Sequence, residues 1–256
     1  MNRLAGALRL AVLELLARRG RILALLAFAV VALAVAATAA ALGREAGHVE
    51  MDTLFALGGY PLISGILLVG WLLGRFPLAA TLVLMSGVVA ADRVTGHDRL
   101  LAVRPAHPAL LYGVRAAVLG SLAFALSAIL LPLFDLIMIG RWAGPATLVL
   151  ILAHVLVWGG LTALLSTLTR LDAWIVLLLA LTAMVWTALN DAALVPLAGP
   201  LADLLAFVLP PQRQLFALES AFADVEPIPW GAFWFCAGYG AVALLVAGWS
   251  VGRRRA

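Results

Sequence analysis

The sequence predicts an all-α polytopic membrane protein with six transmembrane helices, an N-terminal interfacial amphipathic helix and short outer-leaflet helices between the fifth and sixth spans. Of its 256 residues, 65% are hydrophobic and 12% are charged, whereas soluble domains carry about 25% charged residues. Apolar runs of about 20 residues, long enough to cross the hydrocarbon core of a bilayer, recur along the chain. Arginines gather in alternate connections between these runs, as the positive-inside rule expects. We therefore expect one transmembrane domain over residues 1–256.

The first element is predicted to be an interfacial elbow helix within residues 1–21. On a helical wheel Leu4, Leu8 and Val12 fall on one face, and Glu14 and Arg18 gather opposite. Such a helix can lie in the plane of the membrane with its arginines among lipid headgroups. An ordinary solvated N-terminal helix is the alternative.

The spans follow from the apolar runs, and only residues 54–91 are ambiguous. That stretch is long enough for two crossings, with a hinge at Arg75, Phe76 and Pro77. One crossing places the arginines after residue 92 inside, as the positive-inside rule prefers. Residues 54–70 then form an outer-side helix or a partly re-entrant segment. The predicted spans are Ile22–Leu42, Trp71–Ala91, Leu110–Ile139, Pro145–Leu168, Trp174–Leu189 and Trp230–Val251.

The arginine distribution fixes the expected orientation. Under six crossings, 13 of the 17 arginines lie inside and four lie outside or in the outer half of the bilayer. Both termini are therefore predicted to be cytoplasmic, in a cell (inner or plasma) membrane. The outer loop 190–229 is too apolar for a simple solvent loop. Within it, Leu201–Leu209 and Gln214–Phe222 are predicted short helices, separated by prolines that interrupt helix.

Several function classes are disfavoured by composition. No lysine occurs, so the chain lacks the phosphate-binding loop that ends in Gly-Lys-Ser/Thr and is not expected to hydrolyse ATP itself. The single cysteine, Cys236, excludes a multi-cysteine metal site. Only His154 among the histidines lies at membrane depth, which argues against a haem held by paired histidines. Tryptophans at predicted helix ends are typical of an interfacial belt rather than of nucleic-acid binding. We expect no enzyme activity, cofactor or metal in this chain.

Ionisable groups at membrane depth are costly, so they are candidate sites. Counting about 1.5 Å per helical residue from the inner end of each span brings several polar residues to one level near the outer interface. They either snorkel to headgroups and mark helix ends or form an outer gate, in which Arg75 and Asp135 would pair. The candidates are Arg75, Asp135, His154, Asn190 and Asp191.

A short charged segment, residues 92–108, separates the second and third spans. Its pattern is an acidic residue, a glycine, two leucines and a proline: Asp92, Gly96, Leu100, Leu101 and Pro105. With the six spans and the apolar outer loop, this pattern resembles the permease subunits of ABC-2 type ABC transporters. That family more often has Glu at the position of Asp92. The layout and length are also similar to those of the permease for nitrous-oxide reductase maturation.

The resemblance implies an exporter subunit driven by a separate ABC ATP-binding subunit, which would carry ATP and Mg. That subunit would dock on the segment as on a coupling helix, and a second permease copy would complete the path as a homodimer within membrane lipids. Read from its residues alone, the segment is equally compatible with a plain solvated loop. A non-transport membrane anchor is the alternative function, and a stand-alone carrier ranks last because midplane charges are lacking. The implied docking residues are Asp92, Arg93, Gly96, His97, Asp98, Arg99, Arg104 and Pro105.

Overall fold

The protein is helical throughout the residues that the computed structural model describes, which are 3–45, 75–96, 107–138, 140–142, 144–191, 209–223 and 227–253. This confirms the predicted all-α class. Six helical segments are long and apolar enough to cross a membrane. The helices are α1 (Arg3–Ala17), α2 (Arg19–Glu45), α5 (Phe76–Met85), α6 (Ala90–Thr95), α8 (Pro108–Met138), α9 (Ala146–Ser166), α10 (Asp172–Asp191), α12 (Gln212–Ala223) and α13 (Trp230–Arg253).

The six candidate spans correspond to the six predicted ones. They are Arg19–Thr38, Phe76–Thr95, Pro108–Ile137, Ala146–Ser166, Asp172–Leu189 and Trp230–Arg253. The chain is therefore a membrane-embedded, multi-pass protein. The predicted segment 54–70 lies outside the described residues, as does most of the first predicted short helix, Leu201–Leu209. The second short helix, predicted over Gln214–Phe222, is confirmed as α12.

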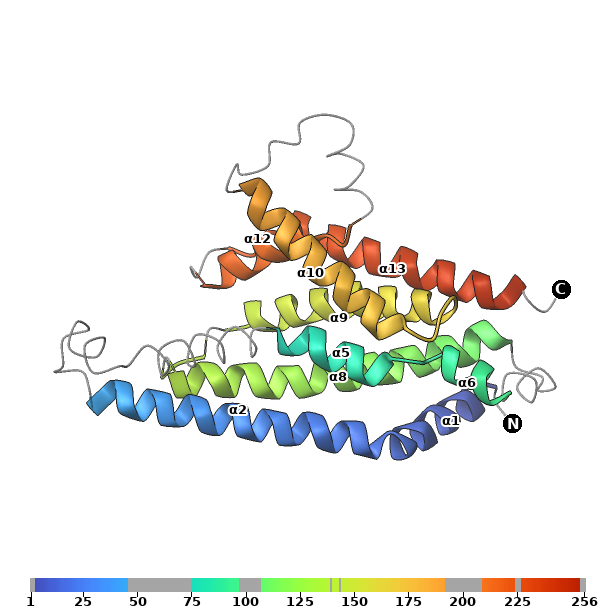
Figure 1. The fold of residues 1–256 in the computed structure, drawn as a ribbon, viewed down its shortest axis with the longest axis horizontal. Helices are drawn as coiled ribbons and strands as arrows, with labels where there is room; N and C mark the ends of the chain where they lie inside the picture. Colours follow the sequence, from blue (N-terminus) through green and yellow to red (C-terminus); the bar gives the residue numbers. More distant parts are fainter. Residues whose placement is uncertain are drawn as a thin grey trace.

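The bundle is built around α9. In Figure 1, α5 and α9 lie between α2 and α8 on one side and α10 and α13 on the other. Of the span in α9, 67% is buried, against 17% of the span in α2. Trp158 on α9 is fully buried and forms a core with residues of α5, α10, α12 and α13. The outer helices α2 and α10 consequently leave most of their apolar side chains for lipid.

The closest helix pair is α9 with α13. A Cβ added at Gly160 would lie 2.6 Å from the carbonyl oxygen of Gly240, and one added at Gly240 would lie 2.3 Å from that of Leu156. Neither distance is possible for a real side chain, so these two backbones touch. Small residues that allow such approach are the usual basis of helix association in membranes.

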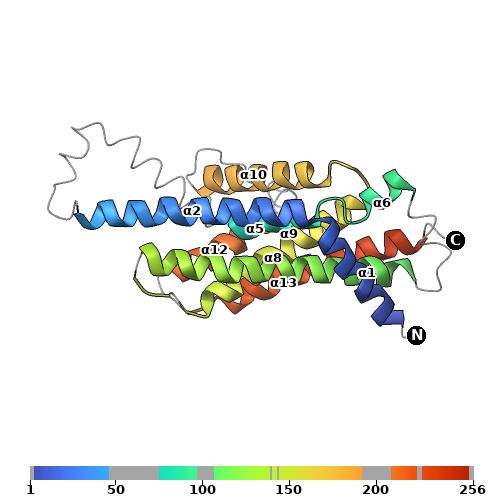
Figure 2. The ribbon, with the colours of Figure 1, turned by 90° about the horizontal axis from the view of Figure 1, so that it is seen from below.

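Helix α1 begins, and α13 ends, at the same end of the bundle, which we call the terminal end (Figure 2). The predicted N-terminal helix is confirmed as α1, which turns away from α2 at Arg18. Ala7 and Ala11 are buried, whereas Leu4, Leu8 and Val12 are exposed. This apolar exposed face fits the interfacial position predicted for α1.

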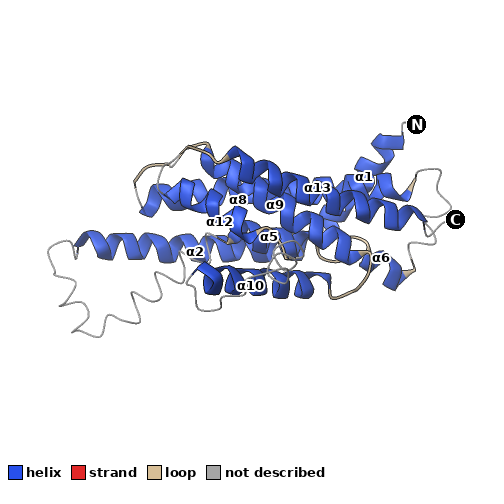
Figure 3. Cartoon of the chain, turned by 90° about the horizontal axis from the view of Figure 1, so that it is seen from above, coloured by secondary structure: helices blue, strands red, loops and turns tan. Residues whose placement is uncertain are grey.

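The second span differs from the continuous helix that the sequence predicted. Helix α5 ends at Met85, four residues of turn follow, and α6 begins at Ala90. We call Ser86–Val89 the break. Gly87 within it has φ of 71°, a left-handed conformation that glycine adopts without the penalty of a Cβ. Figure 3 shows α6 projecting at the terminal end beyond α5.

Candidate functional site

The break leaves backbone groups of the second span without helical partners, and buried backbone groups need other partners. Side chains from other helices supply these partners. Asp172, fully buried at the start of α10, accepts hydrogen bonds from the Gly87 amide at 2.7 Å and the Ser86 hydroxyl at 3.2 Å. Ser166, at the end of α9, accepts from the amides of Val89 and Ala90, both at 3.0 Å.

The carbonyl groups before the break are capped by two arginines from the junction of α1 and α2. Arg18 donates to the carbonyl oxygens of Leu84 and of Ser86, the latter at 2.9 Å. Arg21 also donates to the Ser86 carbonyl, at 3.0 Å. Burial lowers the pKa of Arg18, against the influence of the Asp92 and Asp172 carboxylates, but arginine remains charged at any physiological pH. The elbow of the chain is thereby fixed to the break.

Arg115 of α8 ties the other side of the break to α6. It donates to the Val88 carbonyl at 2.8 Å and to the Asp92 carboxylate at 2.7 Å. It also pairs with Glu14 of α1, whose second oxygen pairs with Arg18 at 2.6 Å. Asp92 is only 8% exposed. A buried carboxylate needs such a partner because an isolated charge in a low dielectric is strongly unfavourable.

Charges of both signs surround the break. Glu14, Asp92 and Asp172 are the carboxylates, and Arg18, Arg21 and Arg115 donate to them or to the carbonyl groups of the break. We call these six residues with Ser166 the break network. Its members come from α1, the α1–α2 junction, α2, α6, α8, α9 and α10. Such a network can hold a non-helical segment in one conformation.

Of the predicted docking residues, the structure describes Asp92, Arg93 and Gly96. The side chains of Asp92 and Arg93 are turned to the bundle, since Arg93 donates to the carbonyl of Thr167 after α9. Gly96 ends α6 with φ of 73°, a conformation that favours glycine at a helix C-terminus. His97, Asp98, Arg99, Arg104 and Pro105 lie outside the described residues.

A second polar cluster joins the start of α5, the middle of α9 and α12. The Arg75 guanidinium pairs with Glu219 of α12, and the same carboxylate oxygen lies 3.1 Å from Nε2 of His154. Trp158 donates its indole N–H to Nδ1 of His154 at 3.1 Å. Nδ1 is therefore the acceptor of a neutral ring, and Nε2–H donates to Glu219. We call these four residues the Glu219 cluster.

The cluster contains two of the predicted gate residues and corrects the partner predicted for one of them. It brings Arg75 and His154 together, but the predicted partner of Arg75 is wrong, because Arg75 pairs with Glu219 rather than Asp135. Asp135 is buried in the last turns of α8 and is not among the partners of Arg75. Asn190 and Asp191 are the last residues of α10, and the description does not extend to their side chains.

The sequence reasoning missed Glu14, Ser166, Asp172 and Glu219 as site residues. Glu219 carried a signal, since it is the one charged residue in the predicted helix Gln214–Phe222. Asp172 falls in the connection between the fourth and fifth predicted spans, where a charged residue is expected. Ser166 and Glu14 gave no signal beyond polarity on a helix.

No group of three His, Cys, Asp or Glu side chains positioned for a metal ion occurs among the residues that the structure describes. No protein-family model matches the chain, and comparisons with curated proteins and with solved structures find no match.

Proposed function

We propose that this chain is the membrane permease subunit of an ABC-type exporter, driven by a separate ATP-binding subunit that docks on the cytoplasmic segment 92–108. The observation that carries the proposal is the break network. Force applied to α6 would pass through Asp92 and Arg115 to α8, and through the break to α5, α10 and the elbow. Packed helix bundles respond to such force by moving between discrete arrangements.

The proposal gives the predicted docking residues two different roles. Asp92 and Arg93 are positioning residues, which hold α6 on α8 and on the segment after α9. The contact with the ATP-binding subunit falls to His97, Asp98, Arg99, Arg104 and Pro105. Gly96 ends α6 and redirects the chain toward that contact.

The arginine asymmetry supports cytoplasmic termini, and hence a cytoplasmic position for α6, in the cell membrane. ATP and Mg would be bound by the partner subunit, because this chain lacks the lysine of a phosphate-binding loop. The resemblance to ABC-2 permeases supports a homodimer that forms the transport path between its two copies. The sequence does not favour any one class of substrate.

The test is affinity purification of the full-length chain from its native membrane, followed by mass spectrometry and an ATPase assay. We expect an ATP-binding subunit to co-purify. The double substitution Arg99→Glu and Arg104→Glu should lower the amount of co-purified ATP-binding subunit several-fold. Arg141→Glu should leave that amount unchanged, because Arg141 is an exposed arginine between α8 and α9. Absence of an ATP-binding subunit from the wild-type sample would overturn the proposal. Redox subunits in its place would favour a membrane anchor.

A further inference from the structure

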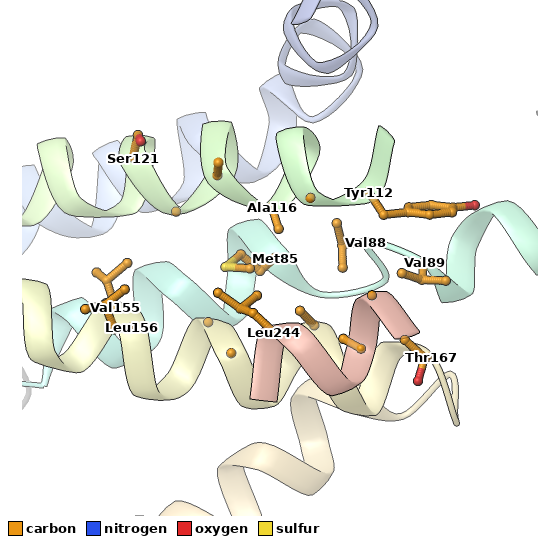
Figure 4. A pocket seen from close by; sticks show the side chains of 18 of the residues that line it. Met85, Val88, Val89, Tyr112, Ala116, Ser121, Val155, Leu156, Thr167 and Leu244 are labelled. Atoms are coloured by element: carbon orange, nitrogen blue, oxygen red, sulfur yellow. The ribbon is translucent and has the colours of Figure 1, made fainter. Parts of the chain in front are cut away.

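A cavity of about 460 Å³ lies between α8, α9 and α13. Met85 and the break residues Val88 and Val89 form part of its wall, as Figure 4 shows. The lining is almost wholly apolar, and small residues of three helices create the space. Those small residues are Ala109, Gly113, Ala116, Ala117, Gly120, Gly159, Gly160, Ala163, Ala247 and Gly248.

The cavity is elongated. Its lining runs along α8 from Ala109 to Phe124 and along α9 from Leu152 to just beyond its end at Thr167. At 1.5 Å per residue each path is roughly 22 Å long. An apolar space that follows two membrane helices over this length suits one extended hydrocarbon chain.

Tyr112 and Thr167 lie at the end of the cavity near α6, whereas Val155, Leu156 and Ser121 lie toward the other end (Figure 4). The lining helices are membrane-spanning segments, and the cavity follows them for more than the roughly 15 Å half-thickness of the hydrocarbon core. An apolar space is unfavourable for water, which needs polar partners. Its volume is in the range of sites that bind small apolar ligands.

We infer that this cavity holds one hydrocarbon tail of a membrane phospholipid, from the leaflet at the terminal end. The tail would run along α8 and α9, with the polar headgroup beyond Tyr112 and Thr167. It would pack against Val88 and Val89, so lipid occupancy would support the break. The inference does not depend on the identity of any ATP-binding partner.

The test uses the full-length protein in nanodiscs that contain a phospholipid with a photoreactive diazirine in the middle of one acyl chain. After illumination, mass spectrometry locates the adducts. We expect them to concentrate in residues 109–124 and 152–167, above the level on the lipid-exposed helices α2 and α10. Those two helices report ordinary boundary lipid within the same sample.

Two substitutions fill the cavity. A Cβ at Gly113 meets nothing within 4 Å, and one at Gly120 makes only ordinary contact, 3.7 Å from Val155. Gly113→Leu and Gly120→Leu should each lower the cavity adducts several-fold and leave those on α2 and α10 unchanged. Gly238→Leu is the matched control, since Gly238 also has open space but does not line the cavity.

Adducts spread evenly over all lipid-facing helices in the wild-type protein would overturn the inference, whatever the variants do. Cavity adducts that persist undiminished in both leucine variants would also overturn it. If one variant fails to fold, the other variant and the wild-type distribution still decide.

Discussion

The break network and the Glu219 cluster both place charged side chains inside the helical bundle, yet they are built differently. At the break, side chains from four other parts of the chain hold the backbone of one span. In the Glu219 cluster, one oxygen of the Glu219 carboxylate contacts both Arg75 and His154, and this oxygen links α12 to them. The first arrangement resists any single movement, whereas the second releases when one helix moves.

The comparison suggests that the break network is a rigid joint at the terminal end. The Glu219 cluster would act as a latch at the opposite end, which separates when α12 moves. Buried charges that are fully paired rigidify a structure, and removing one partner is costly because the others remain buried. The Glu219 carboxylate is exposed to the same 21% as the Arg115 side chain, but it has a single charged partner, so fewer groups lose a contact when it is separated. The predictions below either break this contrast or make it quantitative, from the largest effect to the smallest.

Arg115→Ala should have the largest effect. Arg115 is the cation that pairs with both Asp92 and Glu14, so the substitution removes both ion pairs. It also removes the donor to the Val88 carbonyl. We expect the free energy of unfolding in detergent to fall by about 3–5 kcal/mol, the usual cost of breaking a buried pair. Arg170→Ala, an exposed arginine near the same end, is the control. Equal stability of the two variants would show that the network is not held by Arg115.

Ser166→Ala should have an intermediate effect. The substitution removes the one acceptor shared by the Val89 and Ala90 amides and leaves both N–H groups buried. Two unsatisfied donors predict a loss of about 2–3 kcal/mol in unfolding free energy. Ser220→Ala is matched, because the Ser220 hydroxyl bonds only a carbonyl of its own helix. A loss no greater than that of the control would contradict the role assigned to Ser166.

Glu219→Gln should have the smallest effect on global stability, about 1–2 kcal/mol, because it weakens a single charged connection. Its local effect should be larger. Leu215, fully buried on α12, can be replaced by cysteine in a Cys236→Ala background. Maleimide labelling of that cysteine should accelerate several-fold in the Glu219→Gln variant, but not with Arg213→Gln, an exposed charge on the same helix.

Unchanged labelling would mean that apolar packing alone holds α12 and that the latch does not exist. Accelerated labelling in Ser166→Ala as well would remove the contrast between the two regions, because release at the break would then open the opposite end.

The six spans and α1 could be predicted because they depend on local properties. A run of about 20 apolar residues is sufficient to indicate a membrane span, and the residues of α1 alternate with helical period. The break could not be predicted in this way. Ser86 and Gly87 form a pair that is common in turns, but glycine is also frequent within membrane helices. The partners that stabilise the interruption, Ser166 and Asp172, lie about 80 residues further along the chain.

The error over Asp135 has a similar cause. Counting residues along a helix gives the height of a side chain in the membrane but not the direction in which it points. Arg75 and Asp135 were predicted at comparable heights, yet Arg75 faces α12. The position of Glu219 depends on how α12 packs against α9, and no short-range pattern specifies that packing.

Hydrogen exchange at the break, measured on the full-length protein in nanodiscs, tests the rigid joint most directly. The amides of Gly87, Val89 and Ala90 donate to side chains rather than to a continuous helix. We predict that they exchange as slowly as amides in the middle of α9, and that Ser166→Ala accelerates Val89 and Ala90 while Gly87 stays protected. Exchange of all three wild-type amides as fast as at Arg170, an exposed residue in the connection after α9, would contradict a rigid joint.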